Sequence, residues 1–282
     1  MINQNEKVCS VLSQYQVTAT IEALERAGLP LEGFNLFRSD KKFINNVTRY
    51  AINLMLGSEK LDSQILSLIN DGNYFGPADW LKFYGIKSSN FKLPISINEL
   101  KIILNKDCPF TTGKKIKETH CLFYLPSYWG EEPLSINKWK ELYRVENKIL
   151  FHGPNDFTWL NYEDLYFSNM HAHQNWYLMF VGAMPGLIGH NFTQQKTIFD
   201  EIGYEFAETI EVVSMFLLFW EKNKRSAEKE EESYIGGRTS GINSEPNHIV
   251  VSTSGKMGRE IYIHEGRDWN LPNIGAYAFK KL

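Results

Sequence analysis

Cys108 and His120 are the first residues whose types and spacing could support catalysis. A thiol becomes a nucleophile when a nearby imidazole or a helix N-terminus lowers its pKa, and His120 is predicted on the strand that follows Cys108. Cys108 itself is expected at the end of a helix, where the helix dipole does not favour a thiolate. No local signature of a nucleophile family surrounds it. The simpler interpretation is a buried thiol near a turn and a hydrogen-bonded strand histidine, and a nucleophilic pair is the alternative.

His171-Ala-His173 is the second pattern, because alternate residues of a strand share a face and two such histidines can chelate one metal ion. A metal site needs at least one more ligand, and no candidate stands at a diagnostic spacing. The residues that could supply this ligand are His152, Asp156, Asp164 and His190. A chance occurrence in a polar loop is the alternative interpretation.

A glycine-lysine turn, Phe110 to Lys115, is a third possible site, for phosphate. It lacks the GxxxxGK[ST] frame and the helix that should follow a P-loop, so a basic turn before a strand is the simpler interpretation. The chain also lacks the GxSxG elbow of serine hydrolases. No cofactor is indicated by these patterns, and its identity stays open.

Aromatic residues are abundant, with 7 Trp, 14 Tyr and 18 Phe in 282 residues. Tyr and Trp concentrate at interaction surfaces because they bury much area and keep a polar group. Two predicted loops, 124–129 and 152–159, display Tyr128, Trp129 and Trp159 as candidate contact residues. Packing in the core is the alternative role for these side chains.

Composition limits the class of protein. The net charge is −3 and the isoelectric point is about 6.2, which argues against nucleic-acid binding. The longest apolar run, 212–220, is too short to span a membrane, and the N-terminus lacks a signal-peptide pattern. Three cysteines without paired spacing fit a reducing cytosol. We therefore expect an intracellular, cytoplasmic protein.

The elements that position these residues fall into two regions. Residues 1–94 are expected to be a helical N-terminal region, with helices over 17–28, 41–56, 61–69 and from Pro77 to Phe83. Residues 95–282 are expected to form an α+β domain. Its predicted helices cover 97–105, which starts with a capping box at Ser96, and 135–145, 192–202 and 207–224.

The strands of the second region are expected mainly toward its C-terminal end. Predicted strands cover 119–125, 175–184, 234–239, a hairpin over 249–264, and 274–279. The helix over 207–224 has apolar side chains on nearly all sides, which predicts deep burial. The expected fold class is α+β: a helical N-terminal segment followed by a mostly antiparallel sheet packed against helices.

Three blocks of residues resemble a group of uncharacterised bacterial proteins. The blocks are CPFxxGKxxxETH from Cys108, WxLM…MPG…Q…GYE from Trp176, and NIGAxAxxK from Asn273. The likeness covers roughly the last 185 residues, from about Ile97 onward. It implies a bacterial source and a distinct C-terminal domain, and it brings no activity, cofactor or catalytic residue.

Two functions from different classes remain open. The favoured one is a protein-binding or assembly module that acts through an aromatic-rich surface, because many loop aromatics occur without a complete catalytic frame. The alternative is a hydrolase or transferase that uses Cys108 and His120, or a metal at His171 and His173.

Overall fold

The structure is a computed structural model that describes residues 61–86, 92–146, 150–152, 170–225, 236–242, 248–254, 260–266 and 274–282. The chain divides into two compact units, 1–57 and 58–282, and every described residue belongs to the second. The boundary expected after residue 94 falls inside this unit. The helices predicted over 17–28 and 41–56 lie outside the described residues.

The first sheet has the strand order β1-β2-β6-β12-β7. The bounds are Tyr74–Phe75 for β1, His120–Leu125 for β2, Asn175–Phe180 for β6, Tyr204–Phe206 for β7 and Ala278–Lys280 for β12. β1 runs parallel to β2, and all other neighbours are antiparallel. All six residues of β2 are buried, as are five of the six in β6, so this central pair is covered on both faces.

The second sheet has the order β11-β8-β9-β10-β5. The bounds are Leu150–His152 for β5, Gly236–Ile242 for β8, His248–Ser254 for β9, Glu260–Gly266 for β10 and Ile274–Ala276 for β11. The predicted hairpin is present as the antiparallel pair β9-β10, with Glu260 opposite Ser254. The two edge strands β5 and β11 pair in parallel with their neighbours.

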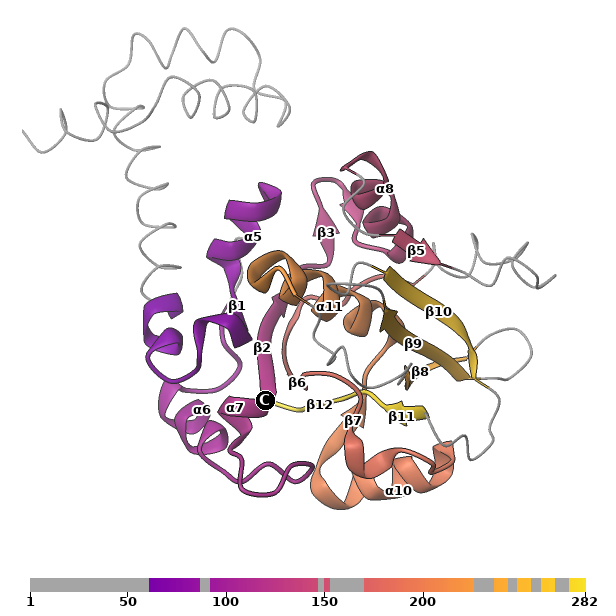
Figure 1. Ribbon diagram of the computed structural model, residues 1–282. Coiled ribbons are helices and arrows are strands. Elements are labelled where there is room, and N and C mark those ends of the chain that lie inside the picture. The colour runs from indigo at the N-terminus through magenta and orange to yellow at the C-terminus, as the bar shows by residue number, and fades with distance from the viewer. Residues whose placement is uncertain are drawn as a thin grey trace, which may run out of the picture. The chain divides into compact units, whose positions relative to one another are not determined.

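Helix α11, Thr209–Asn223, lies between the two sheets (Figure 1). It contacts β1 and β2 of the first sheet and β8 and β9 of the second. Its residues from Thr209 to Trp220 are all buried, which confirms the deep burial predicted from apolar side chains on all of its sides. This helix is the core element to which both sheets are attached.

The chain passes from one sheet to the other at Tyr277, which separates β11 from β12. The sequence predicts one strand over 274–279, and the structure splits it into two that belong to different sheets. Tyr277 is fully buried; its N–H donates to the carbonyl of Arg238 at 3.0 Å and its carbonyl accepts from Ala207 at 3.0 Å. Gly237 permits this crossing, since a Cβ there would meet the Tyr277 ring at 2.5 Å.

The remaining helices cover the sheets. They are a helix over 61–66, α5 Pro77–Tyr84, α6 Ile97–Leu104, α7 Ile116–Thr119, α8 Ile136–Glu146 and α10 Phe192–Ile202, with short 3-10 turns η1 Asp71–Asn73 and η3 Pro185–Leu187. Ser96 and Glu99 form the predicted capping box of α6. A two-stranded hairpin, β3 Tyr128–Trp129 and β4 Glu132–Pro133, precedes α8.

These elements confirm the α+β class and the helices and mostly antiparallel strands expected within the described residues. Two five-stranded sheets replace the single sheet of the prediction. Among the described residues, no helix combines the length and apolar character that a membrane span requires.

Candidate functional site

His120 lies at the start of β2, fully buried, between two hydroxyl groups. Its Nε2 lies 3.0 Å from the hydroxyl of Tyr204, and its Nδ1 lies 2.9 Å from Oγ1 of Thr119. The Thr119 hydroxyl donates to the carbonyl of Lys115 at 3.2 Å, so it can accept from Nδ1–H. Tyr204 then donates to Nε2. This tautomer gives each polar hydrogen of the group an acceptor.

Burial determines the charge state of this group. Desolvation lowers the pKa of His120 to about 3, so the imidazole is neutral at neutral pH. Burial, with a smaller contribution from Cys108, raises the pKa of Tyr204. Lys280 lies 4.9 Å from the centroid of the Tyr204 ring, and burial followed by the charge of Lys106 lowers its pKa. A neutral histidine that accepts from a protonated tyrosine stabilises the fold.

Cys108 lies in the same buried cluster as Tyr204, whose hydroxyl is hydrogen-bonded to His120, so the structure places the predicted catalytic residues in one region of the core. Cys108 is 6% exposed and its N–H donates to the carbonyl of Lys114 at 2.8 Å. His120 is 0% exposed. A substrate reaches neither side chain without local opening of the cluster, so the geometry favours the structural interpretation of this pair.

The predicted metal ligands His171 and His173 are both exposed, and Ala172 between them is buried at 3%. They lie in the segment before β6 rather than in a strand, although His171 forms a single bridge with Ser135. The side chains of residues 171–173 therefore alternate between exposed and buried, and both histidines are exposed. Within the described ranges, no group of three or more His, Cys, Asp or Glu side chains could hold a metal ion.

The predicted contact residues Tyr128 and Trp129 are neighbours in the β3-β4 hairpin with different environments. Tyr128 is 58% exposed, whereas Trp129 is half-buried. The Trp129 ring lies 5.2 Å from the Tyr84 ring, 5.6 Å from that of Trp139 and 6.4 Å from that of Trp80, all edge-to-face. Trp159, the third predicted contact residue, lies outside the described residues.

Most other tryptophans in the described part of the chain belong to the core: Trp80, Trp139, Trp176 and Trp220 are 7% exposed or less. The indole N–H of Trp80 donates to the carbonyl of Tyr124 at 2.6 Å, and that of Trp139 donates to the hydroxyl of Ser214 at 2.8 Å. For these residues, core packing explains the aromatic abundance of the sequence.

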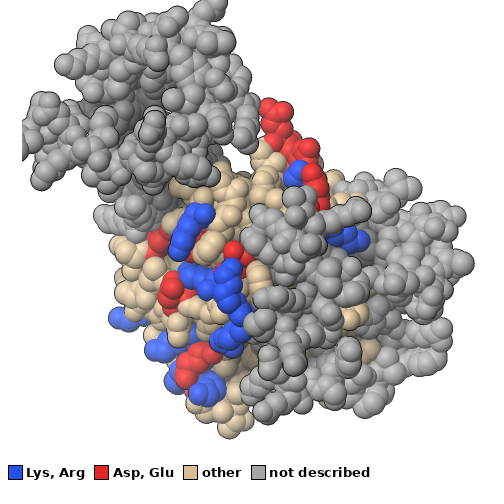
Figure 2. All heavy atoms as spheres, turned by 45° about the horizontal axis from the view of Figure 1, so that its top comes forward, with Lys and Arg blue, Asp and Glu red and all other residues tan. Residues whose placement is uncertain are grey.

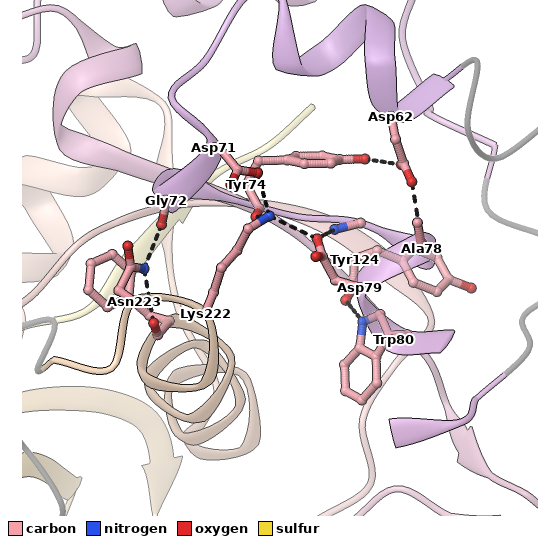
Figure 3. Close-up of polar contacts among 12 residues, drawn as sticks. Asp62, Asp71, Gly72, Tyr74, Ala78, Asp79, Trp80, Tyr124, Lys222 and Asn223 are labelled. Atoms are coloured by element: carbon pink, nitrogen blue, oxygen red, sulfur yellow. Dashed lines mark hydrogen bonds and ion pairs between the residues drawn. The ribbon is translucent and has the colours of Figure 1, made fainter. Parts of the chain in front are cut away.

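A polar network that was not predicted from the sequence centres on Lys222 near the end of α11 (Figure 3). The Lys222 ammonium lies 2.7 Å from Asp71 and 3.1 Å from Asp79, and it donates to the carbonyl of Tyr74 at 2.8 Å. The next residue, Asn223, donates to the carbonyl of Gly72 at 2.8 Å. These contacts fasten α11 to β1 and to the first turn of α5.

Asp62 extends this network on the far side of Tyr74, as Figure 3 shows. The Tyr74 hydroxyl donates to Asp62, and the N–H of Ala78 donates to the other carboxylate oxygen at 3.3 Å. Burial raises the pKa of Asp62. The network holds three carboxylates and one ammonium, and several of its hydrogen bonds join backbone groups, which is typical of a structural cluster.

Glu211 is a second buried carboxyl that sequence patterns did not single out. It is 4% exposed and caps α11 by accepting from the N–H of Glu208 at 2.8 Å. Burial raises its pKa to about 8. A hydrogen bond from Tyr177 opposes this rise, and the Tyr177 hydroxyl also lies 3.2 Å from the carbonyl of His173. This contact links α11 to the segment that carries the exposed histidines.

Charges on the visible part of one face are interleaved, as Figure 2 shows, with basic and acidic side chains side by side on the described residues.

Comparison with known proteins found no matching family model, no matching curated protein and no matching solved structure. The resemblance to bacterial proteins stays a prediction.

Proposed function

We propose that the chain is an intracellular protein-binding module whose contact surface is the β3-β4 hairpin. The observation that carries this proposal is Tyr128, a large aromatic side chain 58% exposed on a short, well-supported hairpin. Exposed aromatic side chains held on a rigid element are typical of residues that dominate binding energy. The buried free thiols Cys108 and Cys121 support a reducing compartment.

The hairpin is held rigid at both ends. Trp129 fixes one side by packing against the aromatic core. At the base, the N–H of Leu134 donates to the carbonyl of Ser127 at 2.8 Å, and the Ser127 hydroxyl accepts from the N–H of Gln174 at 2.8 Å. Little conformational entropy is therefore lost when a partner covers Tyr128.

The charges at the hairpin tip indicate the chemical class of the partner segment. Glu131 and Glu132 are exposed directly after Gly130, and Lys138 neutralises part of this charge through a 2.6 Å ion pair with Glu132. Glu131 forms no ion pair with another residue that the structure describes. A partner segment with apolar side chains for Tyr128 and lysine or arginine beside them complements this surface.

Peptide display against the purified full chain tests the proposal. Selected peptides should combine apolar residues with lysine or arginine, and Tyr128→Ala should weaken their binding about tenfold or more. Glu131→Gln should weaken them less, by removing one exposed charge. Ile102→Ala is the matched control, because Ile102 is 63% exposed on α6, away from the hairpin. Peptides that bind Tyr128→Ala as tightly as the wild type would contradict the proposal.

A hydrolase or transferase is the second candidate, supported by Cys108 and by Tyr204, the hydrogen-bond partner of His120, lying in one buried cluster. This activity needs an opening that exposes the thiol, because Cys108 is only 6% exposed. The rate at which a small alkylating reagent reaches Cys108 in the folded chain distinguishes the two candidates.

A further inference from the structure

An open groove of about 490 Å³ lies between the 67–73 segment and α7, away from the hairpin. Its lining residues are Ser67, Leu68, Ile69, Asn70, Asn73, Lys114, Lys117 and Glu118. The volume lies within the range of small-molecule sites. Two lysines and one glutamate give this lining a net charge of +1.

The positive charge of the groove belongs chiefly to Lys117. Glu118 uses one carboxylate oxygen to accept from the N–H of Lys115 at 2.7 Å, and its other oxygen lies 3.5 Å from the ammonium of Lys114. Within the described residues, Lys117 contacts a neutral acceptor instead, the amide oxygen of Asn105 at 2.9 Å. Its charge is therefore available to an anion.

Neutral donors lie on the opposite side of the groove. Asn70 uses its amide oxygen to accept from the N–H of Gly72 at 3.1 Å, which leaves its NH₂ group for a ligand. The side chain of Asn73 makes no hydrogen bond with the described residues. Leu68, which is half-buried, adds an apolar wall, whereas Ile69 is 5% exposed and contributes little to it. Ammonium and amide donors beside an apolar wall suit a phosphate group attached to an organic body.

The segment that carries the lysines is fixed before any ligand arrives. The carbonyl of Lys114 accepts from the N–H of Cys108 at 2.8 Å, and the N–H of Ile116 donates to the carbonyl of Lys106 at 3.0 Å. Lys115 forms a 2.7 Å ion pair with Asp107, outside the groove lining. Binding therefore needs little ordering of this backbone.

We propose that this groove binds a small phosphate monoester, with Lys117 and Lys114 on the phosphate and Asn70 and Asn73 completing its hydrogen bonds. The site is independent of the hairpin surface. It uses the glycine-lysine turn of the sequence through lysine side chains rather than through a P-loop backbone.

Calorimetric titration of the full chain with adenosine monophosphate, inorganic phosphate and adenosine tests the proposal. Adenosine monophosphate should bind saturably and adenosine should not, and added salt should weaken binding because exposed charges are screened. Lys117→Ala should raise the Kd about tenfold, which corresponds to the loss of one charge-assisted contact. Lys117→Arg should retain binding.

Lys196→Ala is the matched control, because Lys196 is an exposed lysine of α10 outside the groove lining. It should leave the Kd unchanged, and circular dichroism should show all variants folded. If inorganic phosphate bound as tightly as the monoester, the site would recognise the phosphate group alone. This result would overturn the role of the apolar wall. Absence of saturable binding, or equal losses in Lys117→Ala and Lys196→Ala, would overturn the site itself.

Discussion

At the scale of single residues, burial changes the chemistry that a residue type suggests. Histidine is the usual side chain for proton transfer near neutral pH. Burial of His120 opposes this role, because desolvation lowers its pKa to about 3. Glu211 shows the opposite case, a carboxyl whose pKa burial raises to about 8. Burial therefore favours the neutral form of both residues.

The pH dependence of stability follows from the lowered pKa of His120. The unfolded histidine takes up a proton near pH 6.5 and the folded one only near pH 3. The stability that the neutral imidazole contributes is therefore fully present above pH 6.5 and is lost as pH falls toward 3. The loss amounts to a few kcal/mol, at about 1.4 kcal/mol for each unit of the pKa difference.

Urea unfolding between these pH values measures this contribution. His120→Phe should reduce the loss of unfolding free energy in acid, even if it lowers stability at neutral pH through the Tyr204 contact. His171→Gln is the control, since His171 is exposed and its environment changes little on folding. Parallel pH profiles for wild type and His120→Phe would show that His120 is not the responsible group.

At the scale of helices and strands, the sequence predicts those elements whose apolar residues recur with a local period. The helix over 207–224 is predicted because apolar residues occur on all of its sides, and the structure places it between two sheets. The capping box at Ser96 fixes the start of α6 by a local hydrogen bond. Such elements depend on residues a few positions apart, so one sequence suffices to find them.

Other elements depend on distant partners. β1, β3 and β4 have two residues each, too few for any period to appear. The split of 274–279 depends on Tyr277, whose backbone partners are Arg238 and Ala207. The partner of His120 is likewise distant in sequence, because the Tyr204 hydroxyl that contacts it comes from β7. Propensity does not reveal such contacts.

The packing of α11 can be tested by substituting Lys222, because its side chain joins α11 to β1 and η1. Its side chain is 12% exposed, and removing its charge leaves Asp79, 14% exposed, without its cation. Lys222→Met should lower the free energy of unfolding by about 2 kcal/mol, less than for a fully buried pair. Lys224→Met is the control: this lysine is 58% exposed in its ion pair with Glu221 and should cost about 0.5 kcal/mol. Equal losses would contradict the role of Lys222.

At the scale of the whole molecule, two sheets share a single buried helix, and the thiols report on how that arrangement opens. Cys108 is 6% exposed and Cys121 is 2% exposed, and they belong to different clusters of the core. Burial raises the pKa of Cys121 to about 12, which suppresses its thiolate. Reaction of either thiol with a reagent therefore requires the fold to open.

Iodoacetamide labelling followed by peptide mass spectrometry measures this opening. Both thiols should react at least about tenfold more slowly in the folded chain than in denaturant, because the closed state protects them. Cys121 should be the slower of the two. Rapid labelling of Cys108 alone in the native chain would favour the enzyme candidate, because it would show that a small molecule reaches the thiol.

The position of β12 in the first sheet has a consequence for how the protein is made. β12 lies between β6 and β7, and Phe279 is opposite Met179, a hundred residues earlier in the chain. During synthesis, β7 therefore leaves the ribosome before the strand that joins it to the sheet exists. Such long-range pairing is associated with slow folding. Until β12 emerges, the edges of β6 and β7 that pair with it have no partner, and unpaired strand edges make a nascent chain prone to aggregation.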